Sequence, residues 1–398
     1  MADKLILTFN AGSSTIKVGL FALDASAPRR ISKGVIDFHN QSLFFNLSEA
    51  PVVINKPITA EPGDDMTGVL DEVFSALGQR FDLDTLAIVG HRVVHGGDRF
   101  IRSMLLDDKV ETGISDLIPL APLHQTQSLR LIRAIRNLRP NVPQAVSFDT
   151  AFHQTNSDLV RSFAIPRALH DDGIKRYGFH GLSYQFIATR LPKIAPDIAD
   201  KKIVVAHLGS GTSLCGLTGG KSRDTSMSFT ALDGIPMATR SGAIDPGVLL
   251  HLLTQKHYTA GDIETLLYHQ CGLLGVSGIS SDSRDLVASN SPQADLALDL
   301  FALRIAGETA RIANTLDGFD AFVFTAGIGE HQPEIRRRIA DQLAWLGVDL
   351  DPAANAANAT VISTSQSRVK VLVVPTDEEQ VLAYEAEALR SDAFHAKI

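Results

Sequence analysis

Two short stretches of this 398-residue sequence combine small, hydroxyl and basic residues in a pattern that suits phosphate binding. In "LTFNAGSSTIKVGLF", residues 7–21, an apolar run leads into a turn at Asn10–Ser14 and then into alternating apolar and polar residues. The alternation predicts a strand with Ser13, Thr15 and Lys17 on one face. Hydroxyls, an ammonium and a turn whose backbone N–H groups a ligand can approach together suit a phosphate. A plain hairpin turn with a solvated lysine is the alternative.

The same pattern returns in "VVAHLGSGTSLCGL", residues 204–217. Its Gly209-Ser210-Gly211-Thr212 aligns with Gly12-Ser13-Ser14-Thr15, so the step from position 12 to position 209 is 197 residues, about half the chain. Neither turn is a Walker A loop, because GxxxxGK[ST] is absent and a strand follows instead of a helix. Similarity at this spacing predicts two related α/β halves, each presenting a turn to a nucleotide cleft between them.

Composition limits the partners and the compartment. The formal net charge of −8 argues against a nucleic-acid or anionic-membrane surface, which would favour an excess of Lys and Arg. Small molecules or a second copy of the chain are the expected partners. Cys215 and Cys271 match neither a disulfide framework nor a zinc site, which favours the reducing cytoplasm. We expect neither a secretory leader nor a membrane span, because no apolar run approaches ~18 residues.

Two arginines stand in Gly-flanked polar sequence. Arg92 takes the polar position of an apolar strand pattern in "GHRVVHGGDRF", and Arg240 lies in the small-residue loop "ATRSGAIDPG" near Asp245. A guanidinium offers a planar fork to a carboxylate or phosphoryl group. Such charge stabilisation is what phosphoryl transfer needs. An edge-strand or surface arginine is the alternative for Arg92.

Two further side chains are candidates for chemistry. Asp149 ends the apolar strand pattern of "VSFDTAFHQT", where α/β sheets place functional side chains. It could hold Mg²⁺ or orient a water on it, or simply cap the turn that follows. His180, in "RYGFHGLSY", could donate a hydrogen bond to a transferring phosphate, or be a buried structural histidine.

A third glycine-containing stretch follows an apolar strand pattern near the C-terminus. In "FTAGIGEHQPEIRRRI", residues 324–339, we predict a strand, a Gly-rich turn and a helix that begins at Pro333. Gly327 and Gly329 would let backbone N–H groups face an anion or a nucleotide near a helix N-terminus. Together with the two hairpin turns, this stretch predicts a third wall of one nucleotide site.

Taken together, these motifs resemble the acetate kinase family of short-chain carboxylate kinases. The resemblance runs in order over nearly the whole chain, through "NAGSSTIK", "GHRVVHGG", "APLH", "FDTAFH", "RYGFHGLS", "HLGSGTS", "DTSM", "TRSGAIDPG", "GLLGVSGISSD" and "FTAGIGE". It implies the sugar kinase, actin and Hsp70 superfamily fold, with one actin-like domain at 1–149 plus 380–398 and a nucleotide-binding one at 150–379. It also implies a homodimer and reversible, Mg²⁺-dependent transfer of the ATP γ-phosphoryl group to acetate, giving acetyl phosphate and ADP.

The resemblance also implies roles for individual residues. Arg92 and Arg240 would bind the carboxylate and the phosphoryl group, His180 would contact that phosphoryl group, and Asp149 would lie at the catalytic centre. The metal site would be Asn10 and Glu378, and the apolar acyl pocket Val94, Leu123 and Phe179. The nucleotide site would comprise Lys17, His207, Leu208, Gly209, Ser210, Gly211, Asp282, Ser283, Arg284, Gly327, Ile328, Gly329, Glu330 and His331.

The sequence departs from the usual family pattern at several positions near these sites. Ser210 replaces an asparagine, Tyr184 a histidine, Ala243 an aspartate and His331 an asparagine, while Ala231 and Asp233 replace a proline and a glutamate. The changes leave open a propionate or butyrate kinase, or a nucleotide-binding module without catalysis. A sugar kinase is disfavoured, because the two arginines suit a carboxylate acceptor. A phosphoenzyme on Asp149 also stays open.

Overall fold

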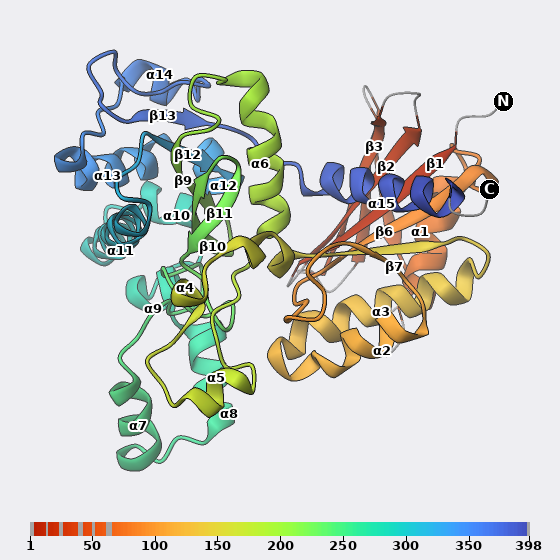
Figure 1. Cartoon of the computed structure of the whole chain (residues 1–398), viewed down its shortest axis with the longest axis horizontal. Coiled ribbons are helices and arrows are strands. Elements are labelled where there is room, and N and C mark those ends of the chain that lie inside the picture. Colours follow the sequence, from red (N-terminus) through yellow and green to blue (C-terminus); the bar gives the residue numbers. More distant parts are fainter. Residues whose placement is uncertain are drawn as a thin grey trace. The chain divides into compact units, whose positions relative to one another are not determined.

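The computed structural model describes residues 4–12, 15–23, 27–38, 43–49, 52–60 and 66–395 (Figure 1). The chain divides into two compact units. Unit 1 comprises residues 1–152 and 377–398, and unit 2 comprises residues 153–376. The sequence placed these boundaries at 149 and 379. The predicted turn residues Ser13 and Ser14 lie outside the described residues.

Unit 1 is built on a mixed sheet of eight strands in the order β5-β4-β3-β2-β1-β6-β8-β7. Its strands β1 to β8 are Leu5–Ala11, Thr15–Leu23, Pro28–Asp37, Leu43–Glu49, Val52–Ile58, Leu86–Val93, Met104–Leu105 and Gln144–Phe148. Its helices are α1 (Thr67–Gly78), α2 (Asp108–Asp116), α3 (Pro122–Leu138) and α15 (Glu378–His395). The terminal helix therefore returns to the unit in which the chain begins.

Alternation along β1 sends its side chains to two different layers. Leu5, Leu7 and Phe9 join an apolar cluster with residues of α1 and α3, whereas Ile6 joins a second cluster with Ala383 and Ala386 of α15. Since successive strand residues face opposite sides, Asn10 shares the α15 side with Ile6. The period-2 pattern of β1 thus brings an amide side chain to the helix that starts at residue 378.

Glycine allows α15 to lie close to this face of the sheet. A Cβ atom at Gly90 of β6 would stand 3.2 Å from the carbonyl oxygen of Leu382 and 3.5 Å from the Cβ of Ala386. At Gly19 of β2 it would stand 3.2 Å from the Cβ of Glu379 and 2.6 Å from the Oγ1 of Thr8. A larger residue at either position would push the helix away, because backbone and Cβ atoms cannot yield as a flexible side chain can.

Unit 2 is built on a five-stranded sheet in the order β11-β10-β9-β12-β13. Its strands are β9 (Lys202–Leu208), β10 (Thr212–Thr218), β11 (Lys221–Thr225), β12 (Ala321–Thr325) and β13 (Lys370–Val373). Its helices α4 to α14 are Asp158–Arg161, Arg167–Asp171, Gly181–Ile194, Pro246–Gln255, Ala260–Thr265, Gly272–Ser277, Ser283–Ala288, Pro292–Leu316, Ala326–His331, Pro333–Leu343 and Pro352–Ala356. A π-helical turn, Leu266–Gln270, links α8 to α9.

The two sheets repeat one topology, as the sequence predicted. β1 pairs antiparallel with β2 and parallel with β6, and β9 pairs antiparallel with β10 and parallel with β12. Moving β1, Leu5–Ala11, by 197 residues gives Lys202–Leu208, the bounds of β9. The second turn is tighter, because Leu208 pairs with Thr212, whereas Ala11 pairs with Ile16. The repeat confirms two related α/β halves.

The long helix α11 covers one face of the second sheet. Its residues Phe301, Ile305 and Ile312 are buried in one cluster with Val204 and Ala206 of β9. Its exposed side carries charged residues such as Asp295 and Arg304 together with Leu296 and Leu303. Across the described ranges, no helix is both long and apolar enough to cross a membrane.

One local prediction from the sequence is wrong. Residues 326–331, expected as a Gly-rich turn, form the short helix α12. In α12 the Glu330 side chain accepts a hydrogen bond of 2.8 Å from the N–H of Ala326, which satisfies an N–H group of the first turn. Gly327 and Gly329 keep negative φ, and only Ala326, at φ +64°, adopts a left-handed conformation.

Three buried histidines make the stability of the fold dependent on pH. His91 stacks on Phe9 and lies 2.7 Å from the Oε1 of Gln144, while the ring of His153 contacts the carbonyl oxygen of Phe179 at 2.9 Å. Burial lowers the pKa of His91, His95 and His153 to about 4 in each case. Since an unfolded histidine titrates near 6.5, the unfolded chain takes up these protons first as the pH falls.

We therefore expect the free energy of unfolding to decrease between pH 6.5 and pH 4, with stability retained above pH 6.5. Between pH 7 and pH 5, each of these histidines should lower the free energy of unfolding by about 2 kcal/mol. Urea unfolding at both pH values tests this, with His91→Gln expected to lose less stability on acidification than the unchanged protein. The exposed His257, changed to Asn, is the control. An equal loss in His91→Gln and the unchanged protein would contradict the prediction.

Candidate active site

Arg92 is the centre of a buried cluster of polar side chains in unit 1. Its Nε and Nη2 atoms donate to the two carboxylate oxygens of Asp149 at 3.0 and 2.6 Å. Its Nη1 donates to the Oδ1 of Asn10 at 3.1 Å and lies 3.9 Å from Glu378. β6 positions Arg92, and Asp149 directly follows β8, the neighbouring parallel strand. The structure therefore brings Asn10, Arg92, Asp149 and Glu378 together; with Glu379 we call them the Arg92 cluster.

The carboxylates keep Arg92 charged in this buried position. Burial by itself would lower the pKa of the guanidinium, but the charges of Asp149 and Glu378 outweigh it and raise that pKa above its ordinary value. The Asp149 side chain is 1% exposed and the Arg92 side chain 12%. A paired guanidinium of fixed geometry is thus held near the carboxyl end of the central strand β6.

Glu379 is a member of the cluster that sequence reasoning missed. The Nδ2 of Asn10 donates 2.8 Å hydrogen bonds to Glu378 and to Glu379. Burial raises the pKa of the Glu379 carboxyl, the charge of Lys17 acts against this rise, and Glu378 adds to it. Lys17 stands opposite Asn10 in the β1–β2 pair. The run of three acids in "DEEQ" was the available signal, because only one of them had been assigned a role.

The three expected acyl-pocket residues differ in burial and are divided between the units. Val94 directly follows β6 in unit 1 and is 5% exposed, whereas Leu123, in the first turn of α3, is 57% exposed. Phe179 is buried in unit 2 beside the helix α6. Val94 and Phe179 therefore offer buried apolar side chains, and Leu123 an exposed one.

Two stacked histidines form the centre of the site residues in unit 2. His180, the residue before α6, and His207, near the end of β9, have ring centroids 4.2 Å apart at 17°. The Nδ1 of His180 lies 2.8 Å from the Oγ of Ser213, and the Nδ1 of His207 lies 2.8 Å from the Oγ of Ser183. His207 and Ser213 are direct partners in the β9–β10 pair, which sets both on one face. We call His180 and His207 the histidine pair.

The second predicted phosphate turn lies beside this pair. A Cβ atom at Gly211 would stand 3.1 Å from the Nε2 of His180 and 3.4 Å from its Cε1, so only glycine lets the turn approach the ring so closely. On its other side, Ser210 accepts a 3.5 Å hydrogen bond from the N–H of Ala238, two residues before Arg240. The turn thus connects the histidine pair to the loop that carries the second candidate arginine.

Arg240 is held differently from Arg92. Its Nη1 donates to the carbonyl oxygen of Ala231 at 3.2 Å, and its guanidinium lies 5.7 Å from the ring centroid of Tyr268. Burial raises the pKa of Tyr268, and the positive charge of Arg240 opposes this rise. Tyr268, which lies in the π-helical turn, was not predicted; its cation–π contact joins segments that sequence spacing does not relate.

The remaining predicted nucleotide residues meet at the start of α10 and at α12. Asp282 caps α10 and binds Arg284, and Ser283 accepts a 2.7 Å hydrogen bond from the Nε2 of Gln332, which directly follows α12. Segments 282–284 and 327–331 are thus connected through Gln332. The buried Arg336 of α13 connects α12 to α14. Its Nη1 donates to the carbonyl of Gly329 in α12, and its Nε donates to the Oδ1 of Asn355 in α14. Neither Gln332 nor Arg336 was predicted.

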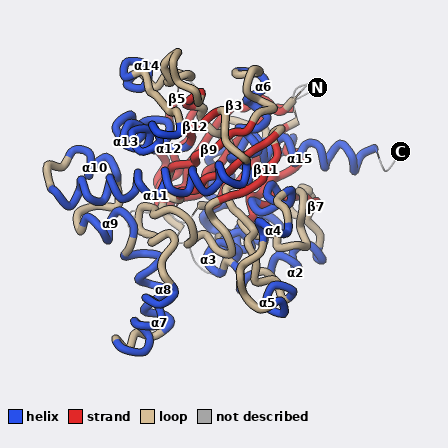
Figure 2. The backbone as a smooth tube through the Cα atoms, turned by 60° about the vertical axis from the view of Figure 1, so that its left-hand side comes forward, coloured by secondary structure: helices blue, strands red, loops and turns tan. Residues whose placement is uncertain are grey.

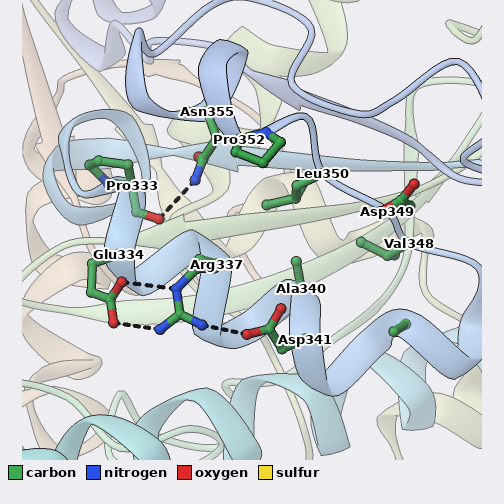
Figure 3. A pocket seen from close by; sticks show the side chains of 11 residues that line it. Pro333, Glu334, Arg337, Ala340, Asp341, Val348, Asp349, Leu350, Pro352 and Asn355 are labelled. Carbon is green, nitrogen blue, oxygen red and sulfur yellow. Dashed lines mark hydrogen bonds and ion pairs between the residues drawn. The ribbon is translucent and has the colours of Figure 1, made fainter.

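A separate pocket of about 470 Å³ is lined by residues of α13 and of the segment 348–355 (Figure 3). Arg337, which lines it, is paired with Glu334 and Asp341, and the Nδ2 of Asn355 donates to the carbonyl of Pro333 at 2.9 Å. None of the predicted site residues lines this pocket. Three of its charged groups, Glu334, Arg337 and Asp341, bind one another.

The carboxylates next to Asn10 are candidates for a metal site. Among the residues that the structure describes, no group of three or more His, Cys, Asp or Glu side chains has the arrangement of a metal site. The carboxylates of Glu378 and Glu379, held by Asn10, are hard ligands of the type that Mg²⁺ prefers. Mg²⁺ commonly uses one or two protein carboxylates together with phosphates of the substrate, so this donor set fits that ion.

Comparison with known proteins gives a consistent result. A sequence profile of the acetokinase family matches residues 5–384. Acetate kinases from Nitrobacter hamburgensis and Rickettsia prowazekii are 44% and 40% identical over 97% and 96% of this chain, and the matches cover 96% and 98% of those proteins. A propionate kinase structure from Francisella tularensis is 34% identical, with a TM-score of 0.89 over 97% of this chain and 100% of that one. An acetate kinase structure from Porphyromonas gingivalis is 33% identical, with a TM-score of 0.85 over 97% and 99% of the two chains.

The pairing of Arg92 with Asp149 has a measurable effect on stability. We expect Arg92→Ala to lower the free energy of unfolding by about 3–5 kcal/mol, because it leaves a buried carboxylate without its partner. The double variant Arg92→Ala/Asp149→Ala should recover part of that loss. Urea unfolding measures both, and Asp116→Ala, which breaks an exposed pair with Arg99, should cost less than about 1 kcal/mol. Simple additivity of the two changes would contradict a coupled pair.

Proposed function

The chain belongs to the acetokinase family, and on this premise we propose that it transfers the γ-phosphoryl group of ATP to acetate, reversibly, giving acetyl phosphate and ADP. The observation that carries the proposal is the family match over residues 5–384 together with the buried, charged Arg92. A carboxyl-accepting phosphotransferase needs fixed positive charge near its acceptor and donors toward the developing phosphoryl charge. The described site residues are of these two kinds.

The two arginines have distinct roles in the proposal. Arg92 is oriented by Asp149 and Asn10, so its position is set before any substrate binds. Arg240 donates to the carbonyl oxygen of Ala231 and lies against the ring of Tyr268. Both would bind the acetate carboxylate and the transferring phosphoryl group, and the charge of Arg240 would serve the phosphoryl oxygens.

Asp149 is a positioning residue for Arg92 in this mechanism. Its two oxygens accept hydrogen bonds from the same guanidinium, and it is 0% exposed. A carboxylate engaged in this way is a weak nucleophile, because attack on phosphorus would break both charge-assisted hydrogen bonds. This supports in-line transfer from ATP to the acetate oxygen over a phosphoenzyme on Asp149.

His180 and the second turn would contact the phosphoryl group as it moves. The Nε2 of His180 adjoins Gly211, and the turn that contains Gly209, Ser210 and Gly211 is closed by a 3.1 Å hydrogen bond from the N–H of Gly209 to the carbonyl of Gly211. Hydrogen-bond donors fixed in advance stabilise charge that develops in the transition state. The ATP molecule would also contact Lys17, His207, Leu208, Asp282, Ser283, Arg284, Gly327, Ile328, Gly329, Glu330 and His331.

We propose that Asn10 and Glu378 hold Mg²⁺, with Glu379 beside them. When bound, Mg²⁺ would neutralise charge on the ATP phosphates. The role of the chain is to fix the two carboxylates, which the Nδ2 of Asn10 does through 2.8 Å hydrogen bonds to each. Arg92, 3.9 Å from Glu378, limits the negative charge that these residues accumulate.

Propionate is the second candidate acceptor. The Francisella tularensis structure, with a TM-score of 0.89, is a propionate kinase, and the acyl pocket would be formed by Val94, Leu123 and Phe179. An apolar pocket discriminates by only ~1–3 kcal/mol for each methylene group. The same pocket would therefore accept propionate at a reduced rate. A module that binds ATP without catalysis is the alternative from another class, motivated by Ser210, Tyr184 and Ala243.

We propose that two copies of the chain associate through the region of α7. This helix, with sequence "PGVLLHLLTQ", has no buried residue, and Figures 1 and 2 show α7 and α8 extending away from the other helices of unit 2. Ile244, Val248, Leu250 and Leu253 are each at least 40% exposed. An apolar helix without a partner is typical of a surface that is buried in a symmetric dimer. Cytoplasmic residence is supported by the free thiols of Cys215 and Cys271.

Trapping of acyl phosphate with hydroxylamine tests the reaction. With Mg-ATP we expect the largest hydroxamate yield from acetate, less from propionate and butyrate, and none after the metal is removed. Arg92→Lys keeps the charge but loses the fork, so kcat/KM should fall by about 100-fold. Asp116→Ala, outside the site, should retain the activity. Binding of ATP without turnover of any acid would favour the non-catalytic module, and faster turnover of propionate would favour a propionate kinase.

Sedimentation equilibrium tests the dimer. The unchanged chain should sediment at twice its 42.9 kDa mass, whereas Leu250→Glu/Leu253→Glu should shift it toward the monomer, because two charges would be buried at the interface. Leu296, on α11, is 60% exposed and lies outside the region of α7, so Leu296→Glu is the matched control. A monomeric unchanged chain, or a dimer that survives the double variant, would contradict the proposed surface.

A further inference from the structure

A chain of hydroxyl groups leads from Tyr184 to the ring of His180. The Tyr184 hydroxyl is hydrogen bonded to the Oγ of Ser213, and that Oγ lies 2.8 Å from the Nδ1 of His180. Tyr184 and Ser213 are both 0% exposed, so bulk water does not compete for these groups. The Tyr184 hydroxyl is thus placed two hydrogen bonds away from a candidate catalytic ring.

The position of the His180 ring is fixed from several sides. Its backbone is left-handed, at φ 55° and ψ 28°, where the chain enters α6. The ring stacks on His207, whose own Nδ1 lies 2.8 Å from the Oγ of Ser183, and Ser183 donates to Thr376 at 2.9 Å. Ser183 and Tyr184 are consecutive residues of the first turn of α6. The first turn of α6 therefore contacts both rings of the histidine pair, His207 through Ser183 and His180 through Tyr184 and Ser213.

The directions of the hydrogen bonds among Tyr184, Ser213 and His180 determine whether Nδ1 or Nε2 of the neutral His180 ring carries the proton. If Tyr184 donates to Ser213, the serine proton is free to be donated to the Nδ1 of His180, and a neutral imidazole then carries its proton on Nε2. If Ser213 donates to Tyr184 instead, Nδ1 must carry the proton and Nε2 presents a lone pair. A phenol is a stronger acid than an aliphatic alcohol, and its O–H is the better hydrogen-bond donor. The first arrangement is therefore favoured.

We propose that Tyr184 is a positioning residue that holds neutral His180 as the Nε2–H tautomer by acting through Ser213. This tautomer presents a donor beside Gly211, where a Cβ atom would stand 3.1 Å from Nε2. The step is an orientation of existing protons and involves no covalent change. Its relevance to catalysis rests on the proposed function, in which His180 donates to the transferring phosphoryl group; the tautomer itself does not depend on that function.

The tautomer is observable directly by NMR. In the full-length protein labelled with ¹⁵N-histidine, at an alkaline pH where the ring is neutral, long-range ¹H–¹⁵N correlations distinguish a protonated from an unprotonated ring nitrogen. The His180 signals are assigned by their loss in His180→Asn. We expect Nε2 to be protonated in the unchanged protein and a mixture of tautomers in Tyr184→Phe, which keeps the ring and removes the hydroxyl. An unchanged His180 spectrum in Tyr184→Phe would overturn the proposal.

Kinetics show whether the tautomer matters for turnover. Tyr184→Phe and Ser213→Ala should each lower kcat by about 10- to 100-fold, with the KM for ATP within about threefold, because a ligand-orienting group acts on the transition state. Their double variant should lose no more than the larger single loss, and Tyr184→Phe should have no further effect in a His180→Ala background. Tyr177→Phe is the matched control, since it removes another buried phenol hydroxyl, which donates to the carbonyl of Gly173 at 2.8 Å.

The outcomes separate this inference from the proposed function. If the unchanged protein forms no hydroxamate with any acid, the proposed function fails, while the NMR comparison still tests the role of Tyr184. If the protein is active and Tyr184→Phe lowers kcat equally with and without His180, Tyr184 acts by another route and the inference fails. Circular dichroism and thermal unfolding of both Tyr184→Phe and Ser213→Ala identify a variant that does not fold, and the other variant then decides.

Discussion

The hydrogen bonds from Asn10 to Glu378 and Glu379 are the constraint on which the site in unit 1 depends. They join the first strand to the last helix, across 368 residues of sequence for the Glu378 contact. Strand periodicity places Asn10 on the side of β1 that faces α15, and Gly90 lets that helix approach the sheet closely. The same amide accepts from Arg92, which in turn binds Asp149. If α15 were displaced, Asn10 would lose both carboxylates, and the buried charge of Arg92 would depend on Asp149 alone among the acids described here.

Local patterns in the sequence were sufficient to predict the hairpin strands and their repetition in the two units. Alternation predicted both hairpins, and the offset of 197 residues predicted that β9 and β10 repeat β1 and β2. The strand pattern of residues 144–149 correctly placed Asp149 at the end of β8, because burial over five residues followed by a charged residue marks the edge of a sheet. Arg92 was proposed as a site residue for a similar reason, because it is the polar residue in an apolar strand pattern. The family resemblance then assigned the polar residues to one reaction, which spacing alone could not do.

Interactions between distant segments were outside the reach of these patterns. Glu379 belongs to the Arg92 cluster only because the first turn of α15 meets β1, and Ser213 reaches His180 only because β10 pairs with β9. Tyr268 looked like an ordinary residue of an apolar segment, and nothing in its neighbours indicated the contact with Arg240. The Gly-rich stretch at 326–331 was misjudged for a related reason: glycine permits a turn but does not require one. There the side chain of Glu330 completes the first turn of a helix instead.

The charges of the candidate site residues differ between the two units. The Arg92 cluster of unit 1 is rich in carboxylates, and this affects how an anionic substrate would bind. Around Arg92 and Asn10 stand three carboxylates, from Asp149, Glu378 and Glu379, so the Arg92 cluster by itself would not attract a free polyphosphate. In unit 2, the guanidinium of Arg240 lies against the ring of Tyr268 and donates to the carbonyl oxygen of Ala231. A nucleotide that brings its own divalent cation would offset the negative charge of these three carboxylates. The excess of acid in the Arg92 cluster is therefore an argument for binding ATP as its magnesium complex rather than as the free anion.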